Sequence, residues 1–210
     1  MKNNEAWPPP NFSEALSDSD PRLALDITKA ALNNEIQRNK SEGLIDEATG
    51  AYTPKAIDQI IKPALERPLQ ENEPVYLIFT DLDGFKQVND SEGYQAGDTI
   101  ISLFGEILSM NARHGVDFVI RIHPETGDEF AVVMQGNEEA VDAYVNRSRN
   151  SLESAAWGSG SQAGKNVGVS YSCGVERLTN LDDFNGTLER AAVNMKIDKE
   201  KRKKLTGTDR

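Results

Sequence analysis

The stretch VYLIFTDLDGFKQVNDSEGYQAGD, residues 75–98, decides the fold of this chain. Its first six residues form an uninterrupted apolar run of strand length, which is typical of a strand buried on both faces of a sheet. The acidic and turn residues DLDG follow directly at 81–84. We therefore predict a central strand whose carboxyl end carries two closely spaced carboxylates.

The sequence around this strand predicts a mixed α/β domain. Apolar residues at helical spacing, together with capping and turn residues, indicate helices over 53–63, 98–110, about 137–152, and from about 188 into the basic tail KEKRKK. Further strands are predicted over 117–122, 129–135 and 167–175, with a loop over 157–166. The Pro and Gly of HPETGD, between the first two of these strands, favour an antiparallel hairpin.

The segment before this domain has a different character. Its first 20 residues are rich in Pro, Asn, Ser and Asp and indicate a loose arm. Asp20 and Pro21 are a typical helix start and Gly43 a typical stop, so we predict a helix over 21–42. This helix either packs on its own domain or pairs two subunits. We expect an N-terminal arm and helix at 1–43 and a catalytic domain at 44–206.

Composition limits the function classes. The 210 residues include 34 acidic and 23 basic ones, for a formal charge of −11, which argues against a nucleic-acid partner. No apolar run approaches the roughly 18 residues of a membrane span. The single cysteine, Cys173, excludes an intramolecular disulfide framework and fits a reducing cytosol. We therefore expect a cytoplasmic protein without a membrane span.

Two acidic clusters follow or precede predicted strands. Asp81 and Asp83 end the central strand, and Asp128 and Glu129 lie in the turn of the hairpin. If the hairpin lies beside the central strand, these carboxylates meet at one end of one sheet. Magnesium prefers one or two carboxylates together with substrate phosphates, so the pair of clusters indicates a divalent-cation site.

FTDLDGFKQVNDSEGYQAGD (79–98), followed by RIHPETGDEF (121–130), resembles the GGDEF domain of the diguanylate cyclase family. DEATGAY (46–52) is similar to the segment that opens such domains, and 188–204 to the closing helix. The resemblance implies a palm-like nucleotidyl cyclase fold. That fold has a central, mainly antiparallel sheet of about five strands flanked by helices, here with an N-terminal helical extension.

The resemblance also implies an activity. Family members condense two GTP molecules into cyclic di-GMP and release two pyrophosphates, and two domains act together as a homodimer. Asp81, Asp128 and the backbone carbonyl of Leu82 occupy the family's metal-binding positions, for Mg²⁺ or Mn²⁺. Glu129 occupies the adjacent position, proposed in the family as metal ligand or as base for the 3′-hydroxyl. A divalent cation lowers the pKa of that hydroxyl and offsets charge on the phosphate.

Further positions imply recognition of GTP. Asn89 and Asp98 fall on the guanine-reading positions, although Gly97-Asp98 is also an ordinary helix start. A carboxylate accepts hydrogen bonds from guanine N1–H and the N2 amine, and adenine lacks both donors. The phosphate contacts are expected from the turn with Phe85 and Lys86, from the Gly127 backbone, and from Lys199 and Lys203. The basic tail is equally readable as a solvated face.

The sequence departs from the family in three places. Thr126-Gly127 replaces the usual Gly-Gly, and His123, Pro124 and Glu125 are inserted before it. We expect His123 and Glu125 to be exposed turn residues rather than extra ligands. The family's R-x-x-D product site is not matched, because aligning its Asp on Asp117 places His114 at the Arg position. The alternatives to an active cyclase are a degenerate regulatory module that binds GTP or a partner protein, and a related nucleotidyltransferase that makes another product.

Overall fold

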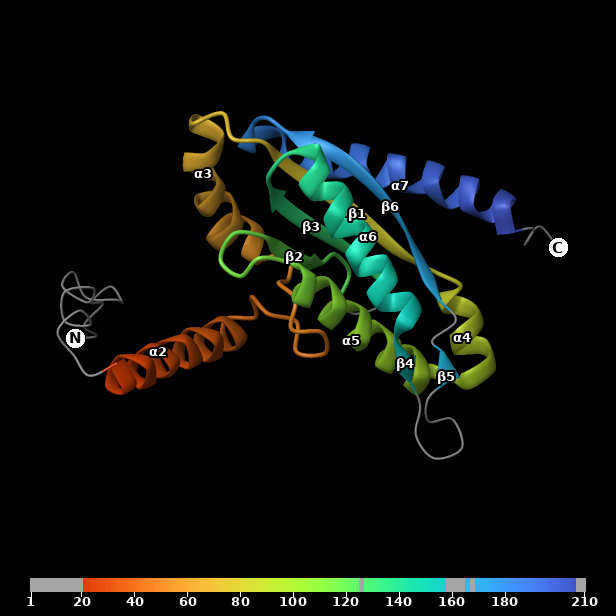
Figure 1. Ribbon diagram of the computed structural model, residues 1–210, viewed down its shortest axis with the longest axis horizontal. Coiled ribbons are helices and arrows are strands. Elements are labelled where there is room, and N and C mark those ends of the chain that lie inside the picture. Colours follow the sequence, from red (N-terminus) through yellow and green to blue (C-terminus); the bar gives the residue numbers. More distant parts are fainter. Residues whose placement is uncertain (1–20, 125–126, 158–164, 167–168, 207–210) are drawn as a thin grey trace. The chain divides into compact units, whose positions relative to one another are not determined.

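A computed structural model of the chain describes residues 21–124, 127–157, 165–166 and 169–206 (Figure 1). The chain divides into two compact units, 1–42 and 43–210. In the first unit, helix α2 spans Pro21–Ser41, as its helical spacing predicts, whereas the predicted N-cap Asp20 lies outside the described residues. Gly43 follows with a φ of 70°, the left-handed conformation that commonly ends helices. Within the described ranges no helix is long and apolar enough to cross a bilayer.

The second unit is built on an antiparallel sheet. Its strands are ordered β2-β3-β1-β6, with bounds β1 Val75–Asp83, β2 Phe118–Arg121, β3 Glu129–Gln135 and β6 Ser170–Leu178. The antiparallel pairing of β2 with β3 confirms the predicted hairpin, and β1 is central. The described residues place four strands in this sheet, where about five were expected. β4 (Ala156–Trp157) and β5 (Lys165–Asn166) pair separately, in a region predicted as loop.

Helices cover both faces of the sheet (Figure 1). Tyr76 and Ile78 of β1 pack toward α5 (Tyr94–Asn111) and α6 (Glu138–Ser154). Val75, Leu77 and Phe79 face the other way, toward η1 (Ile57–Ile61), α3 (Lys62–Gln70) and α7 (Phe184–Thr206). Burial on both faces explains why β1 reads as a continuous apolar run. The alternation also means that Asp81 and Asp83 share the face that α7 covers.

The predicted end of the helix near Pro63 is wrong. The helical path continues through Pro63 to Gln70, because η1 is a π-helix in which the Lys62 N–H donates to the Ile57 carbonyl. The chain therefore changes its hydrogen-bond pattern immediately before Pro63. Pro63 then lies in the first turn of α3, where its missing N–H removes no helical bond.

Other boundaries differ from prediction by a few residues. α5 begins at Tyr94, after the positive-φ residue Gly93, so Asp98 lies in its second turn and is not a helix cap. The predicted turn at 83–86 is divided between the end of β1, Gly84 and the start of α4 (Phe85–Glu92). The last strand runs beyond residue 175 to Leu178, and a 3₁₀ turn, η3 (Leu181–Asp183), leads into α7 before residue 188. These shifts follow tertiary packing, which local propensity does not encode.

Candidate functional site

Two acidic strand ends meet at one edge of the sheet. Asp81 of β1 lies directly opposite Glu129 of β3 in the antiparallel register, so their side chains emerge on the same face. Asp128 precedes Glu129 in the chain. The pKa of the Asp128 carboxyl is raised, first by partial burial and next by the negative charge of Asp81. The structure thus brings Asp81, Asp128 and Glu129 together, as the hairpin predicted.

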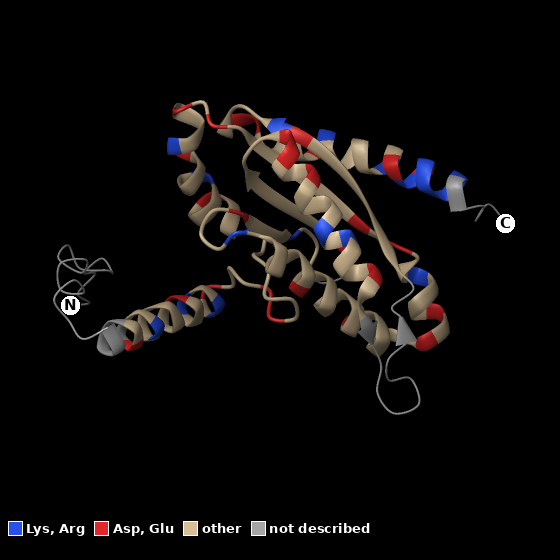
Figure 2. Cartoon of the chain, viewed as in Figure 1, with Lys and Arg blue, Asp and Glu red and all other residues tan. Residues whose placement is uncertain are grey.

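Basic residues gather toward the C-terminal end of α7 (Figure 2), and two of them contact this acidic edge. The Lys199 ammonium donates to the Asp81 carboxylate and lies 3.9 Å from Oδ1 of Asp83. Arg202 Nε is 3.7 Å from Oδ2 of the same Asp83. Lys203, four residues after Lys199, is exposed. Lys199, one of the two lysines predicted to bind phosphate from α7, therefore contacts the acidic cluster.

The Asp83 carboxylate is a member of the site that the sequence reasoning left without a role. It accepts hydrogen bonds from Ser172 Oγ at 2.9 Å and from Ser170 Oγ at 3.2 Å, both on the neighbouring strand β6. The strand period of two places it on the same face as Asp81, and that period was the available signal. Its serine partners were not foreseeable, because they lie almost 90 residues further along the chain.

The carboxylates fit a hard divalent cation in their chemistry. Aspartate and glutamate oxygens with a backbone carbonyl, here that of Leu82, are the donor types that Mg²⁺ and Mn²⁺ take. The pKa of Asp128 is raised first by burial of its carboxyl and second by the negative charge of Asp81, and a cation between Asp81 and Asp128 would offset both costs of ionisation. Within the described residues, however, no three His, Cys, Asp or Glu side chains already form a ligand cluster. Lys199 on Asp81 gives one reason, since that carboxylate already has a cationic partner.

A buried ion pair fixes the turn that carries Asp128. Arg121 NH1 is 3.1 Å from Asp46 Oδ1, and both side chains are almost fully buried. The same guanidinium donates to the Gly127 carbonyl at 3.2 and 3.3 Å. Asp46 also accepts from the Thr49 N–H and hydroxyl, so the 46–50 segment is tied to the turn. Gly127 thus contributes its backbone to the turn, whereas Thr126 and Glu125 lie outside the described residues.

His123 lies beside the acidic cluster. Its Nε2 is 3.3 Å from Oε2 of Glu129, although the imidazole is 62% exposed. The expectation of an exposed side chain at 123 is therefore met, but the side chain faces a site residue. The bond from the Gly127 N–H to the His123 carbonyl accompanies this position, and the sequence pattern carried no signal for it.

The helix pair after β1 forms the second part of the candidate site. Gly84, with a φ of 80°, precedes the first turn of α4, where Phe85 and Lys86 have N–H groups free of intrahelical acceptors. Further along α4, Asn89 lies against Gly97 of α5: a Cβ at Gly97 would stand 1.9 Å from Asn89 Oδ1. That Oδ1 is buried with no hydrogen-bond partner among the described residues, which suits an atom that meets a ligand. Asp98, next to Gly97, is exposed.

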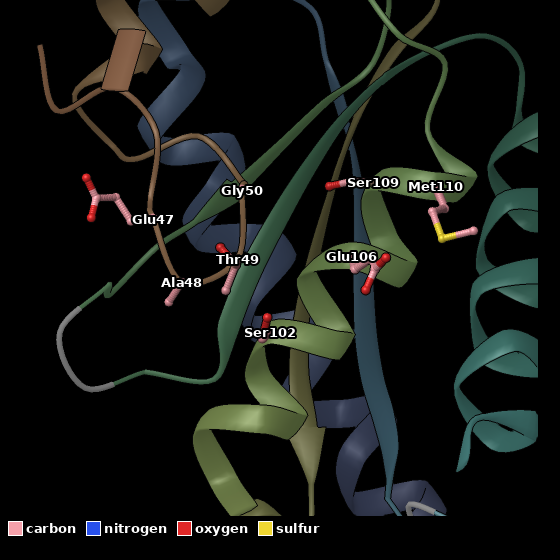
Figure 3. A pocket seen from close by; sticks show the side chains of 8 residues that line it. All are labelled: Glu47, Ala48, Thr49, Gly50, Ser102, Glu106, Ser109 and Met110. Atoms are coloured by element: carbon pink, nitrogen blue, oxygen red, sulfur yellow. The ribbon is translucent and has the colours of Figure 1, made fainter. Parts of the chain in front are cut away.

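A separate hollow of about 490 Å³ lies between residues 47–50 and α5 (Figure 3). Ser102, Glu106, Ser109 and Met110 line it from the helix. None of the acidic strand-end residues borders this hollow. It is therefore distinct from the site at the sheet edge.

Asp117, the residue aligned with the Asp of the family's R-x-x-D product site, is already bonded inside the domain. Arg113 Nε and NH2 donate to the two Asp117 carboxylate oxygens at 2.9 and 2.7 Å, and the N–H of Gln135 donates to Asp117 as well. The Asp117 side chain is 1% exposed. This carboxylate is thus committed to interactions inside the domain.

Comparisons with known proteins agree with this geometry. The family model described as diguanylate cyclase, GGDEF domain, matches residues 44–204. Diguanylate cyclase DgcS of Shewanella oneidensis is 33% identical over 138 residues, covering 66% of this chain and 44% of the relative. Probable diguanylate cyclase DgcJ of Escherichia coli is 29% identical over 109 residues, or 52% of this chain and 21% of the relative. The chain therefore spans less than half the length of these curated relatives.

Solved structures share the fold. The coiled coil and GGDEF domain of DgcB from Caulobacter crescentus, in complex with c-di-GMP, gives a TM-score of 0.66 at 21% identity. That match covers 86% of this chain and 93% of the other.

Proposed function

Because the chain belongs to the family of diguanylate cyclase GGDEF domains, matched over residues 44–204, we propose that it condenses two GTP molecules into cyclic di-GMP and two pyrophosphates. The observation that carries the proposal is the register of β1 with β3, which sets Asp81 opposite Glu129. Asp128, whose ionised form is disfavoured first by burial and next by the charge of Asp81, completes the acidic group. Residues 44–206 are the proposed catalytic domain, and 1–43 its N-terminal extension.

The acidic residues would hold Mg²⁺ or Mn²⁺ through Asp81, Asp128, Glu129 and the Leu82 carbonyl. When bound, such a cation lowers the pKa of the attacking 3′-hydroxyl and offsets charge on the α-phosphate. We propose that Glu129 accepts the proton of that hydroxyl, because its side chain is only partly buried and lies on the same face as Asp81. In-line attack then displaces pyrophosphate.

The substrate is proposed to lie across the start of α4. The N–H groups of its first turn, at Phe85 and Lys86, suit the β- and γ-phosphates. The N–H of Gly127, the other expected backbone contact, donates to the His123 carbonyl in this structure and would have to be released to meet a phosphate. Lys199 and Lys203 add positive charge from α7. Asn89 and Asp98 would read guanine, and the unpartnered Oδ1 of Asn89 is the atom that supports this assignment.

Catalysis is proposed to need two copies of the chain, because each domain supplies one GTP and the reaction joins two. Helix α2 offers a means of pairing. Leu25, Leu32 and Ile36 recur along it at spacings of seven and four and are 52%, 40% and 38% exposed. DgcB, whose solved structure contains a coiled coil with its GGDEF domain, supports this role for a preceding helix. Unchanged oligomeric state and turnover after deletion of residues 1–42 would contradict it.

The direct test of the proposed function is to incubate the purified chain with GTP and Mg²⁺ and to measure pyrophosphate and nucleotide products. We expect cyclic di-GMP, and its loss in Glu129→Gln, a variant of nearly equal volume without the charge. Binding of GTP without turnover would instead indicate the degenerate regulatory module. Product from ATP, or a linear oligonucleotide, would indicate a different nucleotidyltransferase.

A further inference from the structure

His123 is held at a fixed place beside the acidic cluster. The Ile122 N–H donates to the Glu129 carbonyl at 3.0 Å, so strand pairing continues one residue beyond β2. His123 is the next residue, and its Nε2 lies 3.3 Å from Glu129 Oε2. An inserted residue that family resemblance assigns no role therefore faces a carboxylate of the proposed reaction centre.

Hydrogen bonds of the turn hold the backbone of His123 in place. The Gly127 N–H donates to the His123 carbonyl at 2.8 Å, and a Cβ at Gly127 would stand only 2.7 Å from the His123 Cβ. The Gly127 carbonyl in turn accepts from Arg121, which is anchored by the buried Asp46. These contacts hold the backbone of His123 beside Glu129, and from this position its imidazole reaches the Glu129 carboxylate.

The separation of the two side chains suits two ligands of one cation. Donor atoms about 2.0–2.1 Å from a metal and at right angles to each other are about 3 Å apart, close to the observed 3.3 Å. An imidazole nitrogen is a favourable ligand for Co²⁺ and other transition metals and a poor one for Mg²⁺. An ion pair that merely positions Glu129 would affect all divalent cations alike.

We propose that His123 is a nitrogen ligand of the divalent cation bound at Asp128 and Glu129, and that it shifts the preference of this site from Mg²⁺ toward transition metals such as Co²⁺. The proposal deepens the proposed function, on which it rests for the location of the cation. It assigns His123, one of the inserted residues, a role in cation choice.

The chain contains two histidines, which provides a matched control. The full chain and its variants His123→Ala and His114→Ala are titrated by calorimetry with Co²⁺ alone and with Mg²⁺ alone, and visible absorption follows the Co²⁺ coordination. We expect His123→Ala to weaken Co²⁺ binding by about tenfold or more and Mg²⁺ binding by less than about twofold. His114→Ala, which alters an exposed residue before β2, should change neither.

Circular dichroism of each variant verifies that it is folded, and His123→Asn provides a second, polar replacement if His123→Ala is not. Equal losses for Co²⁺ and Mg²⁺, unchanged Co²⁺ binding in folded variants, or no Co²⁺ binding to the unaltered chain would each overturn the proposal. No nucleotide is present in these titrations, so the result is independent of whether the chain makes cyclic di-GMP.

Discussion

Lys199 links the proposed cation site to the proposed phosphate site, and its replacement should affect the two in opposite directions. Its ammonium pairs with Asp81 and lies near Asp83, so it occupies the place where the proposed divalent cation would bind. Lys199→Ala removes that competing charge. The same change removes a positive charge that the triphosphate of GTP would use. We expect tighter binding of a divalent cation alone and weaker binding of nucleotide.

The magnitude follows from the exposure of the pair. Two unit charges at 4 Å attract by about 1 kcal/mol in water and about 4 kcal/mol at an effective dielectric constant of 20. The Lys199 side chain is 27% exposed and that of Asp81 17%, so the pair is partly screened and its attraction lies between these two limits. A value of about 1.4 kcal/mol corresponds to about a tenfold gain in affinity for Mn²⁺ alone. A similar or larger loss is expected for nucleotide.

Calorimetry with Mn²⁺ alone, and then with a GTP analogue whose α,β-bridging oxygen is a methylene group, separates the two effects. Lys196→Ala is the matched control, because Lys196 is exposed on the same helix and, among the described residues, forms no ion pair with the acidic edge. Lys196→Ala should change neither the Mn²⁺ affinity nor the nucleotide affinity by more than about twofold. Unchanged or weaker Mn²⁺ affinity in Lys199→Ala would refute the reasoning, since the lysine would then not compete for Asp81.

Three further outcomes are expected. Asp128→Asn should raise the melting temperature at pH 7. Folding raises the pKa of the Asp128 carboxyl, so the folded protein loses stability as the pH rises through that pKa and the group ionises. The gain in melting temperature should vanish near pH 3, and the same variant should lose cation binding. Gly97→Ala should weaken GTP binding about tenfold or more by displacing Asn89, and Gly97→Ala combined with Asn89→Ala should be no worse than either change alone, as measured by calorimetry. Cyclic di-GMP should not inhibit turnover with high affinity through Arg113 and Asp117, whose charges satisfy each other, and inhibition abolished by Arg113→Ala would contradict this.

The central part of the fold was predictable because its signals are local. A strand covered on both faces must be apolar at every position, and the run at 75–80 has that property. The hairpin follows from two short strands and a Pro-Gly turn, and its register brings Glu129 opposite Asp81. Strand geometry alone therefore predicts that the two acidic motifs, each weak by itself, lie together in space.

The rest of the site depends on contacts that are distant in sequence. Arg121 and Asp46 are 75 positions apart, and no local pattern indicates that they pair. The position of His123 depends on how the inserted residues close against Gly127. Likewise, the early start of α5 reflects the cap at Gly93 and the packing of Gly97 on Asn89, and it changes the expected role of Asp98 as a helix cap.

The basic end of α7 has contacts that composition could not indicate. As a sequence, KEKRKK was equally readable as a solvated face or as a phosphate contact. In the structure, Lys199 and Arg202, three residues apart, turn toward the acidic edge, while Lys201, Lys203 and Lys204 are exposed. One helix thus pairs with the carboxylates of β1 and also presents exposed positive charge beside them. It follows that a cation at Asp81 and a phosphate near α7 should bind cooperatively, because each relieves Lys199 of its competing partner.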